Sequence, residues 1–457
     1  MREKYYDHNA NKERQLNKVV IIGGGLAGSE CAWALAEAGV EVTLYEMKPV
    51  KYSEAHTDER LGELICSNSL RSSEPSTAIG ILKEEMTTLG SLVMEAANAT
   101  KVPAGKALAV DRDKFAQYIT DKITAHDKIA LVREEVESLK SDKLDGADAI
   151  VVAAGPLASS SLVESLLELI GDTRLYFYDA IAPIISTDSV DTNKAFWGSR
   201  YNPEDHSYLN CPMTEEEYDT FLDALLEAEK VVPREFEKEI HFEGCLPVEA
   251  MAERGRQTLT FGPLKPVGLE LPDGGQAYAV VQLRAENEEK TSMNMVGFQT
   301  KLKYPEQKRV FSMIPGLENA EFLRLGSIHR NTYVNAPLVL NNDLSLKTRK
   351  DVFLAGQITG VEGYLESAAC GLWLGYCLTR KFQGMETPDL PQETALGGLM
   401  NHLREEKKNF QPSNSHFGLT PPLNKRAPKK VRKELYGKRA QELFAQWLES
   451  VNDESDE

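Results

Sequence analysis

The feature that most constrains this chain is a glycine-rich turn between two short apolar strands near its N-terminal end. Residues Lys18–Ile22 (KVVII) predict a buried strand, and the turn Gly23–Gly28 (GGGLAG) follows it directly. Apolar residues then recur at helical spacing as far as Gly39, and Val40–Tyr45 (VEVTLY) predicts a second strand. Strand, turn, helix and strand in this order indicate a βαβ unit that binds a nucleotide.

Each glycine of the Gly23-x-Gly25-x-x-Gly28 pattern has a physical role. The first permits a tight turn, the second lets backbone N–H groups reach a pyrophosphate, and the third allows helix and strand to pack closely. Glu46 ends the second strand, where a carboxylate can accept hydrogen bonds from ribose hydroxyls. The predicted nucleotide contacts are therefore Gly23, Gly24, Gly25, Leu26, Ala27, Gly28 and Glu46.

Two later segments favour FAD over NAD as the nucleotide. Asp148–Gly155 (DAIVVAAG) and Asp351–Gln357 (DVFLAGQ) are buried-strand patterns that run into glycine. They resemble the elements that flavoproteins of the glutathione-reductase type place behind the pyrophosphate and beside the ribityl chain. Either segment alone is equally well explained as a core strand, but the pair favours FAD. The resemblance implies cofactor contacts from Gly155, Asp351 (to the ribityl chain), Gly356 and Gln357.

The order of these segments predicts an α/β fold in which one domain is split by another. From about residue 186 the composition shifts to aromatics, prolines and short alternating segments, and the buried-strand pattern returns only at Asp351. We therefore predict a split Rossmann-like FAD-binding domain, similar to that of MnmG (GidA), with an inserted α+β substrate domain. The predicted boundaries are 1–17 for a disordered tail, 18–185 plus 346–445 for the FAD-binding domain, 186–345 for the inserted domain and 446–457 for an acidic tail.

Composition narrows the class of protein further. Lys and Arg number 52 against 70 Asp and Glu, and the net charge of −18 excludes a uniformly basic nucleic-acid-binding protein. No apolar run reaches the length of about 18 residues that a bilayer requires, and the N-terminal residues lack the apolar stretch of a signal peptide. The six cysteines include no CxxC pair, which argues against a zinc site or a disulfide scaffold. We expect a cytoplasmic enzyme without a metal.

Two of the cysteines stand in contexts unlike a protein core. Cys66 lies in a polar loop (LICSNSLR), and Cys245 lies in a turn flanked by glycine and proline (FEGCLPVE). Cys31, Cys370 and Cys377 instead belong to apolar helical segments, as buried cysteines usually do. The residues alone leave a chemical and a structural role equally open for Cys66 and Cys245.

Seven segments, taken in order along the chain, resemble the TrmFO family of folate- and FAD-dependent tRNA (uracil-5-)-methyltransferases. They are IIGGGLAGSECAWALA, GELICSNSLRS, FEGCLPVEAMAERG, LRAENEE, MVGFQTKLKYPEQKRVFSMIPGLENAEF, HRNTYVNAP and FLAGQITGVEGYLESAA. The similarity runs from about residue 18 to 440. It implies an enzyme that methylates the T-loop uridine 54 of tRNA to ribothymidine. The methylene would come from methylenetetrahydrofolate, and the electrons from reduced FAD, recharged by NADPH or NADH.

The resemblance assigns this chemistry to three side chains. Uracil C5 becomes nucleophilic once a thiolate adds to C6, and a base must later remove the C5 proton. Cys66 is the expected nucleophile and Cys245 the expected acid or base, although the two roles could be exchanged. Tyr364 matches an aromatic position near the flavin, and a purely structural role for it stays open.

Residues that match other family segments are expected to contact folate or RNA. An acidic enzyme needs local basic patches to bind RNA phosphates, and two such patches exist. In Lys425–Arg439 eight basic residues stand against one glutamate, and Lys301, Lys303, Lys308 and Arg309 form a second cluster. An ordinary solvated surface explains either patch, taken alone, about as well. The expected folate or RNA contacts are Arg284, Tyr304, His329, Lys429 and Lys430.

Two alternative functions stay open. The same chemistry could act on a uridine of ribosomal RNA, or the chain could be an MnmG-like flavoenzyme that modifies the wobble uridine. The segment GELICSNSLRS and the lack of the extra C-terminal helical region of MnmG favour TrmFO. A flavin disulfide reductase would need a proximal cysteine pair, which this sequence lacks.

Overall fold

The structure is a computed structural model. It describes residues 17–453 except 172–173, 203, 232–245, 387–388, 409 and 425–426; the side chains of 174–179, 330, 429–430 and 452–453 are also outside the description. The expected N-terminal tail, 1–17, therefore lies almost wholly outside the described residues. Among the described residues, no helix has both the length and the apolar character needed to cross a membrane.

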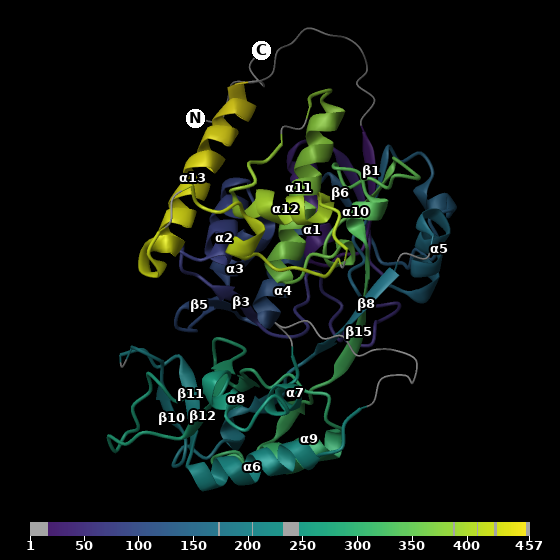
Figure 1. Ribbon diagram of the computed structural model, residues 1–457. Coiled ribbons are helices and arrows are strands. Elements are labelled where there is room, and N and C mark those ends of the chain that lie inside the picture. The colour runs from purple at the N-terminus through teal and green to yellow at the C-terminus, as the bar shows by residue number, and fades with distance from the viewer. Residues whose placement is uncertain are drawn as a thin grey trace.

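The larger domain is built on a five-stranded parallel sheet (Figure 1). The last strand in sequence joins the sheet after the whole inserted segment, so the domain is split, as predicted. In spatial order the strands are β16 (Val352–Leu354), β7 (Ala149–Val152), β1 (Lys18–Ile22), β2 (Glu41–Tyr45) and β6 (Ile129–Val132). Strands β1, β7 and β16 are almost entirely buried apolar runs, as expected of a parallel sheet covered on both faces, whereas β2 and β6 are only partly buried.

Helices surround this sheet, and a small three-stranded sheet flanks it. The central helix α1 packs against α11, where a Cβ on Gly371 would lie 2.0 Å from the carbonyl oxygen of Ala27. Only glycine allows this close approach. The helices are α1 (Leu26–Glu37), α2 (Ala78–Thr88), α3 (Leu92–Ala99), α4 (Arg112–Ala125), α5 (Ser160–Ile170), α10 (Ala336–Val339), α11 (Tyr364–Phe382), α12 (Ala395–Arg404) and α13 (Lys429–Asp453), and the small sheet holds β3 (Ser69–Ser72), β5 (Ala107–Val110) and β4 (Lys101–Val102).

The inserted domain is a six-stranded antiparallel sheet with short helices. Its acidic helix α6 (Glu215–Glu227) starts at a capping box between Thr214 and Glu217 and buries an apolar face against the sheet. The strands in spatial order are β10 (Phe196–Gly198), β11 (Tyr208–Met213), β12 (Ala279–Ala285), β13 (Ser292–Met295), β9 (Ile184–Ser186) and β14 (Phe322–Arg324), and the other helices are α7 (Val248–Ala252), α8 (Thr258–Phe261) and α9 (Tyr304–Phe311).

A two-stranded antiparallel ribbon, β8 (Arg174–Ala180) and β15 (Ile328–Val334), joins the two domains (Figure 1). The core of the inserted domain already begins at Ala182, and Tyr333 again belongs to the core of the larger domain. The predicted boundaries at 186 and 345 are corrected accordingly, the second one to a position before Tyr333. Composition failed there because residues 333–346 mix apolar and polar residues, so no change of pattern marks the return to the larger domain.

The C-terminal segment also differs from the prediction. Residues 446–453 are not a tail, because α13 continues to Asp453 and buries Trp447 and Val451 in the core of the larger domain. Trp447 lies against Trp373 and Tyr376 of α11, with ring centroids 6.0 and 5.8 Å away. The acidic residues on the outer face of the helix suggested a polar tail in the sequence, so the apolar face was not predicted.

Candidate functional site

A cavity opens at the carboxyl ends of the parallel strands, where the chain leaves β1, β2, β7 and β16. Open α/β sheets bind their ligands at this edge. The predicted nucleotide contacts and the predicted catalytic loop meet in this one place. Of the residues predicted from sequence, those that line it are Gly23, Gly25, Leu26, Ala27, Glu46, Cys66, Gly155, His329, Gly356, Gln357 and Tyr364.

The glycines of the first turn have distinct roles. Gly23 has φ +109°, and a Cβ there would lie 2.5 Å from the carbonyl oxygen of Ala153. A Cβ on Gly28 would lie 1.8 Å from the carbonyl oxygen of Gly23, so the fold itself requires both residues. Gly25 differs, because it has φ −72° and a Cβ there would meet nothing within 4 Å. The space beside Gly25 is therefore open for a ligand to approach the backbone. Gly24 and Gly28 do not line the cavity.

Glu46 lies buried at the end of β2 with its carboxylate on the glycine turn. Its Oε2 accepts a hydrogen bond from the N–H of Gly24 at 2.8 Å, and its Oε1 accepts one from the N–H of Lys48 at 3.0 Å. Each carboxylate oxygen has a second lone pair. The side chain is thus fixed by the protein and can still accept hydrogen bonds from the hydroxyls of a ribose.

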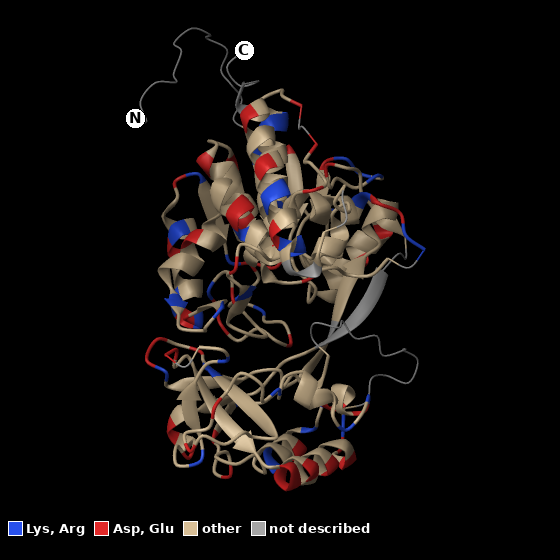
Figure 2. Ribbon diagram, turned by 60° about the vertical axis from the view of Figure 1, so that its left-hand side comes forward, with Lys and Arg blue, Asp and Glu red and all other residues tan. Residues whose placement is uncertain are grey.

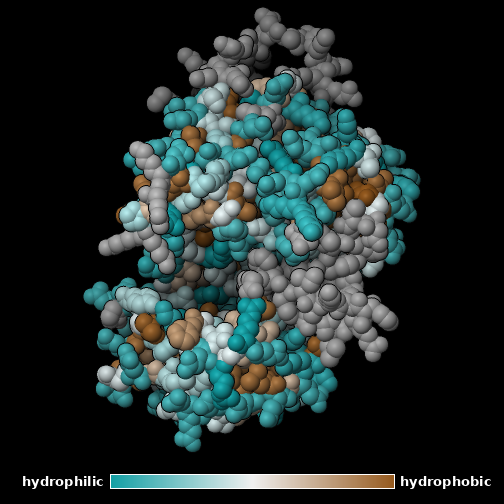
Figure 3. Space-filling model, viewed as in Figure 1, coloured by the Kyte–Doolittle hydropathy of each residue, from teal (hydrophilic) through white to brown (hydrophobic). Residues whose placement is uncertain are grey.

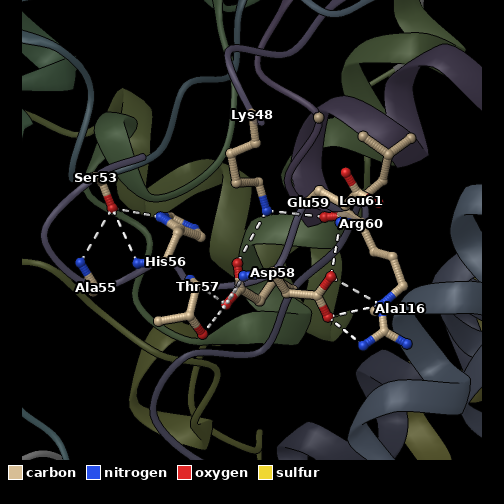
Figure 4. Close-up of polar contacts among 12 residues, drawn as sticks. Lys48, Ser53, Ala55, His56, Thr57, Asp58, Glu59, Arg60, Leu61 and Ala116 are labelled. Atoms are coloured by element: carbon tan, nitrogen blue, oxygen red, sulfur yellow. Dashed lines mark hydrogen bonds and ion pairs between the residues drawn. The ribbon is translucent and has the colours of Figure 1, made fainter. Parts of the chain in front are cut away.

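Residues 48–63 form a loop beside Glu46 that is held by internal polar contacts (Figure 4). Lys48 Nζ donates to Glu63 Oε2 at 3.0 Å and to the carbonyl oxygen of Arg60 at 2.9 Å. Glu63 Oε1 accepts from the N–H of Thr57 at 2.9 Å. Lys48 and Glu63 both line the cavity, and their side chains are only 5% and 7% exposed. This buried ion pair shapes one wall of the nucleotide end.

Arg60 and His56 make further polar contacts that complete the loop (Figure 4). Arg60 holds Asp58 and also reaches α4, where its Nη1 donates to the carbonyl oxygen of Asp113 at 2.8 Å. His56 lines the cavity with Nδ1 2.5 Å from Ser53 Oγ. Burial lowers the pKa of His56, and the nearby charge of Lys48 lowers it further. The imidazole is therefore neutral at physiological pH and can accept or donate a single hydrogen bond.

Glu63→Gln is expected to destabilise the protein by about 3 kcal/mol, because it leaves the Lys48 ammonium buried without its counter-charge. Urea denaturation followed by circular dichroism measures this loss. Glu135→Gln is the matched control, since Glu135 pairs with Lys51 at 2.7 Å, and the Lys51 side chain is 48% exposed. That pair should contribute less than about 1 kcal/mol. Equal losses in the two variants would contradict this ranking.

The third predicted segment contributes Gly356 and Gln357 to the cavity, but the prediction for Asp351 is wrong. Asp351 precedes β16, and only the carboxyl end of that parallel strand faces the cavity. Its carboxylate instead binds Arg349 at 3.1 Å. Gln357 is held by a hydrogen bond from its Nε2 to Glu362 Oε2 at 2.6 Å. The strand separates Asp351 from any ligand that contacts Gly356.

Cys66 and Tyr364 meet at the cavity although they are far apart in sequence. The N–H groups of Cys66 and Ser67 both donate to the Tyr364 hydroxyl oxygen, at 2.6 and 3.2 Å. The Cys66 Sγ lies 3.8 Å from the carbonyl oxygen of Ala180. Burial raises the pKa of Tyr364, and repulsion from an ionised Cys66 raises it further. The phenol thus stays protonated, and its proton can be donated to a group in the cavity.

His329 and Asn331 extend the same wall from β15. They alternate along the strand, so both side chains project from one face, and both line the cavity. His329 Nε2 lies 2.8 Å from Ser327 Oγ, whereas its buried Nδ1 has no partner among the described residues. Burial lowers the pKa of His329. His329 thus belongs to the cavity, as a neutral group with one vacant hydrogen-bonding position.

The structure does not bring the remaining predicted residues to the cavity. Arg284 is buried on β12 and binds Asn68 Oδ1 at 2.9 Å and Ser67 Oγ at 2.7 Å, so it holds the Cys66 loop instead of lining the cavity. Tyr304 begins α9 and is 57% exposed, outside the cavity. Cys245 lies outside the described residues, as do the side chains of Lys429 and Lys430, which begin α13.

Sequence reasoning missed several groups at the site. Lys48 and His56 line the cavity, and Arg112 and Arg324 bind the backbone of the Cys66 loop. Only His56 carried a usable signal in the sequence. It is one of eight histidines in the chain, and it stands in a polar segment shortly before Cys66. The two arginines come from different domains, and no spacing along the chain indicates that they converge.

The parallel sheet, the glycine turn and the cavity at its edge define a protein with the FAD-binding Rossmann-type fold. Comparison with solved structures agrees. GidA from Aquifex aeolicus (crystal form II) superposes with a TM-score of 0.65 at 17% sequence identity, covering 95% of this chain and 74% of that one. The family model described as Glucose inhibited division protein A (GIDA) matches residues 18–386.

Closer relatives place the chain more finely. Proteins named methylenetetrahydrofolate–tRNA-(uracil-5-)-methyltransferase TrmFO from Oleidesulfovibrio alaskensis, Geobacter sulfurreducens and Aquifex aeolicus are 63%, 55% and 54% identical to it. These matches cover 94%, 95% and 95% of this chain and 97%, 99% and 97% of the relatives. The chain therefore belongs to the TrmFO family, within the larger group that the GIDA model describes.

Proposed function

We propose that this protein is a folate- and FAD-dependent enzyme that methylates C5 of a uridine in tRNA. The observation that carries the proposal is a single cavity in which the nucleotide cradle around Gly25 and Glu46 meets the Cys66–Tyr364 pair. Membership of the TrmFO family, whose relatives are named for this reaction, supports the substrate and the methyl donor. Uridine 54 of the T-loop as the target and NADPH or NADH as the reductant are the finer parts of the proposal.

The residues of the cavity fit FAD. The open space beside Gly25, at the N-terminus of α1, suits a pyrophosphate, and the lone pairs left on Glu46 suit a ribose. Gly155, Gly356 and Gln357 also line the cavity and would contribute further contacts to the cofactor. FAD bound there and reduced by a nicotinamide supplies the electrons that turn a transferred methylene into a methyl group.

The protein's own side chains would handle the uracil. The Cys66 thiolate adds to C6 and makes C5 nucleophilic, and it leaves again once the C5 proton has been removed. The Tyr364 hydroxyl oxygen accepts hydrogen bonds from the N–H groups of Cys66 and Ser67, and its proton can be donated to a group in the cavity. Cys245 is the proposed acid or base. In the alternative scheme, Cys245 is the nucleophile and Cys66 the acid or base.

Positive charge supports a proposed RNA-binding surface on α13. Arg432, Lys433 and Lys438 are exposed on this helix, and its basic N-terminal end points toward the inserted domain (Figure 1). The alternative cluster is partly neutralised, because Lys303 binds Glu229 at 2.6 Å and Arg309 binds Glu306. The neighbouring α6 is rich in acidic residues, which colour much of its ribbon red in Figure 2. The tRNA would thus approach along α13 and the hollow between the two domains visible in Figure 3.

Methyl transfer from labelled methylenetetrahydrofolate to unmodified tRNA is the experiment that tests the function. With FAD and NADPH or NADH, label should appear in a T-loop uridine, and a parallel reaction with labelled S-adenosylmethionine should transfer none. A tRNA transcript with cytidine in place of the target uridine is the control. Label transferred from S-adenosylmethionine alone, or label that appears only in ribosomal RNA, would contradict the proposal.

A further inference from the structure

Arginines from both domains hold the loop that carries Cys66. Arg112 of α4 donates through Nη1 to the carbonyl oxygen of Leu64, and Arg324 of β14 donates to that of Ile65 at 2.9 Å. On the other side of Cys66, Arg284 of β12 binds Ser67 Oγ at 2.7 Å and Asn68 Oδ1 at 2.9 Å. Two of these three guanidinium groups belong to the inserted domain. The Cys66 loop is therefore positioned only when the two domains are docked.

Among the residues that the structure describes, the two guanidinium groups from the inserted domain form no ion pair. Arg112 pairs with Glu286 at 2.7 Å. Arg284 is 6% exposed and binds only neutral acceptors, and Arg324, which is partly buried, binds only the carbonyl oxygens of Ile65 and Ala55. Within the described part of the chain, neither of these two reaches a carboxylate at ion-pair distance. Buried charges in proteins are usually paired, so an anion is expected beside them.

The Cys66 thiolate is an anion that the chain itself can supply there. Burial lowers the pKa of Arg284 and of Arg324. Attraction to Glu286 and Tyr208 opposes that effect at Arg284, attraction to Tyr364 and Glu63 opposes it at Arg324, and attraction to an ionised Cys66 opposes it at both. The loop also has Arg112 and Glu286, which pair with each other, and Lys48 and Glu63, which likewise form an ion pair, around it. Burial raises the pKa of Tyr208 and of Tyr364 and lowers that of His56 and of His329, so these four groups are neutral. The neighbourhood of Cys66 thus has an excess of positive charge.

We infer that Arg284 and Arg324 are positioning residues that hold the Cys66 loop and stabilise its thiolate, so that the inserted domain activates a nucleophile carried by the FAD-binding domain. This inference rests on the proposed function only in giving Cys66 the role of nucleophile. On ionisation the thiol proton passes to solvent, and the negative charge on sulfur takes the place of the missing counter-ion. Docking of the inserted domain then controls both the geometry and the reactivity of the thiol.

The test is alkylation of Cys66 by iodoacetamide in the FAD-loaded full-length protein, followed across pH by peptide mass spectrometry. Arg324→Gln keeps an amide donor for the Ile65 carbonyl oxygen but removes the charge. It should slow Cys66 alkylation about tenfold at pH 7. Arg324→Lys keeps the charge and should stay within about threefold of the unmodified protein. Arg284→Gln should act in the same direction as Arg324→Gln.

Arg200→Gln is the matched control. Arg200 is also a partly buried arginine of the inserted domain that binds neutral acceptors, namely the Lys265 carbonyl oxygen and Gln282 Oε1, but it does not touch the Cys66 loop. It should leave Cys66 alkylation unchanged. Equal alkylation profiles for unmodified protein, Arg324→Gln and Arg284→Gln would overturn the inference, as would equal slowing by Arg324→Lys and Arg324→Gln. Since the assay contains no RNA or folate, its result is independent of whether the methylation assay succeeds.

Discussion

Gly25→Val should give a folded protein that carries no FAD. The residue has an ordinary extended backbone, and its Cβ would enter space in which no protein atom lies within 4 Å. The chain can therefore accommodate valine, but the branched side chain occupies the approach to the backbone that a pyrophosphate needs. We expect visible flavin absorbance per chain to fall to background, with unchanged circular dichroism.

Gly28→Ala is the contrasting variant. Its Cβ would lie 1.8 Å from the carbonyl oxygen of Gly23, so helix α1 has to move away from β1. This variant should lose flavin and thermal stability together, whereas Gly25→Val should lose flavin only. A Gly25→Val protein that purifies with a full complement of FAD would show that the cofactor does not lie against this turn.

The split sheet was predictable because local sequence encodes it. Its predicted strands are short and mostly apolar and are followed by glycine or a carboxylate, and the pattern reappears at Val352 after the inserted segment. Glu46 and Gly356 could be placed because parallel strands share one carboxyl edge. Asp351 was misplaced because a resemblance between strand motifs does not tell which end of the strand carries the functional carboxylate.

The parts that could not be predicted depend on contacts between distant segments. Cys66 reaches Tyr364 across 298 positions, and Arg284 reaches Ser67 across 217. Neither residue type indicates such a distant partner. A motif that contains Arg284 does not show whether the arginine side chain faces a ligand or holds a loop. The apolar face of α13 was missed for a similar reason, since Trp447 and Val451 are spaced between charged residues.

Trapping with 5-fluorouridine should separate the roles of the two proposed thiols. In a tRNA with 5-fluorouridine at the target position, the C5 substituent cannot leave as a cation, so the bond between sulfur and C6 persists. The unmodified protein should therefore form a covalent adduct that survives denaturing electrophoresis. Cys66→Ala should abolish both this adduct and methylation, whereas Cys245→Ala should abolish methylation and still allow some adduct.

Cys211→Ala is the control for loss of a thiol as such, because Cys211 is fully buried in the core of the inserted domain, away from the cavity. It should keep both the adduct and methylation. Peptide mapping locates the modified residue directly. An adduct on Cys245 would reverse the roles of the two cysteines, and it would also remove the reason for the arginines around Cys66 to stabilise a thiolate. An adduct on neither cysteine would contradict nucleophilic catalysis by this cavity, because no other thiol among the described residues lines it.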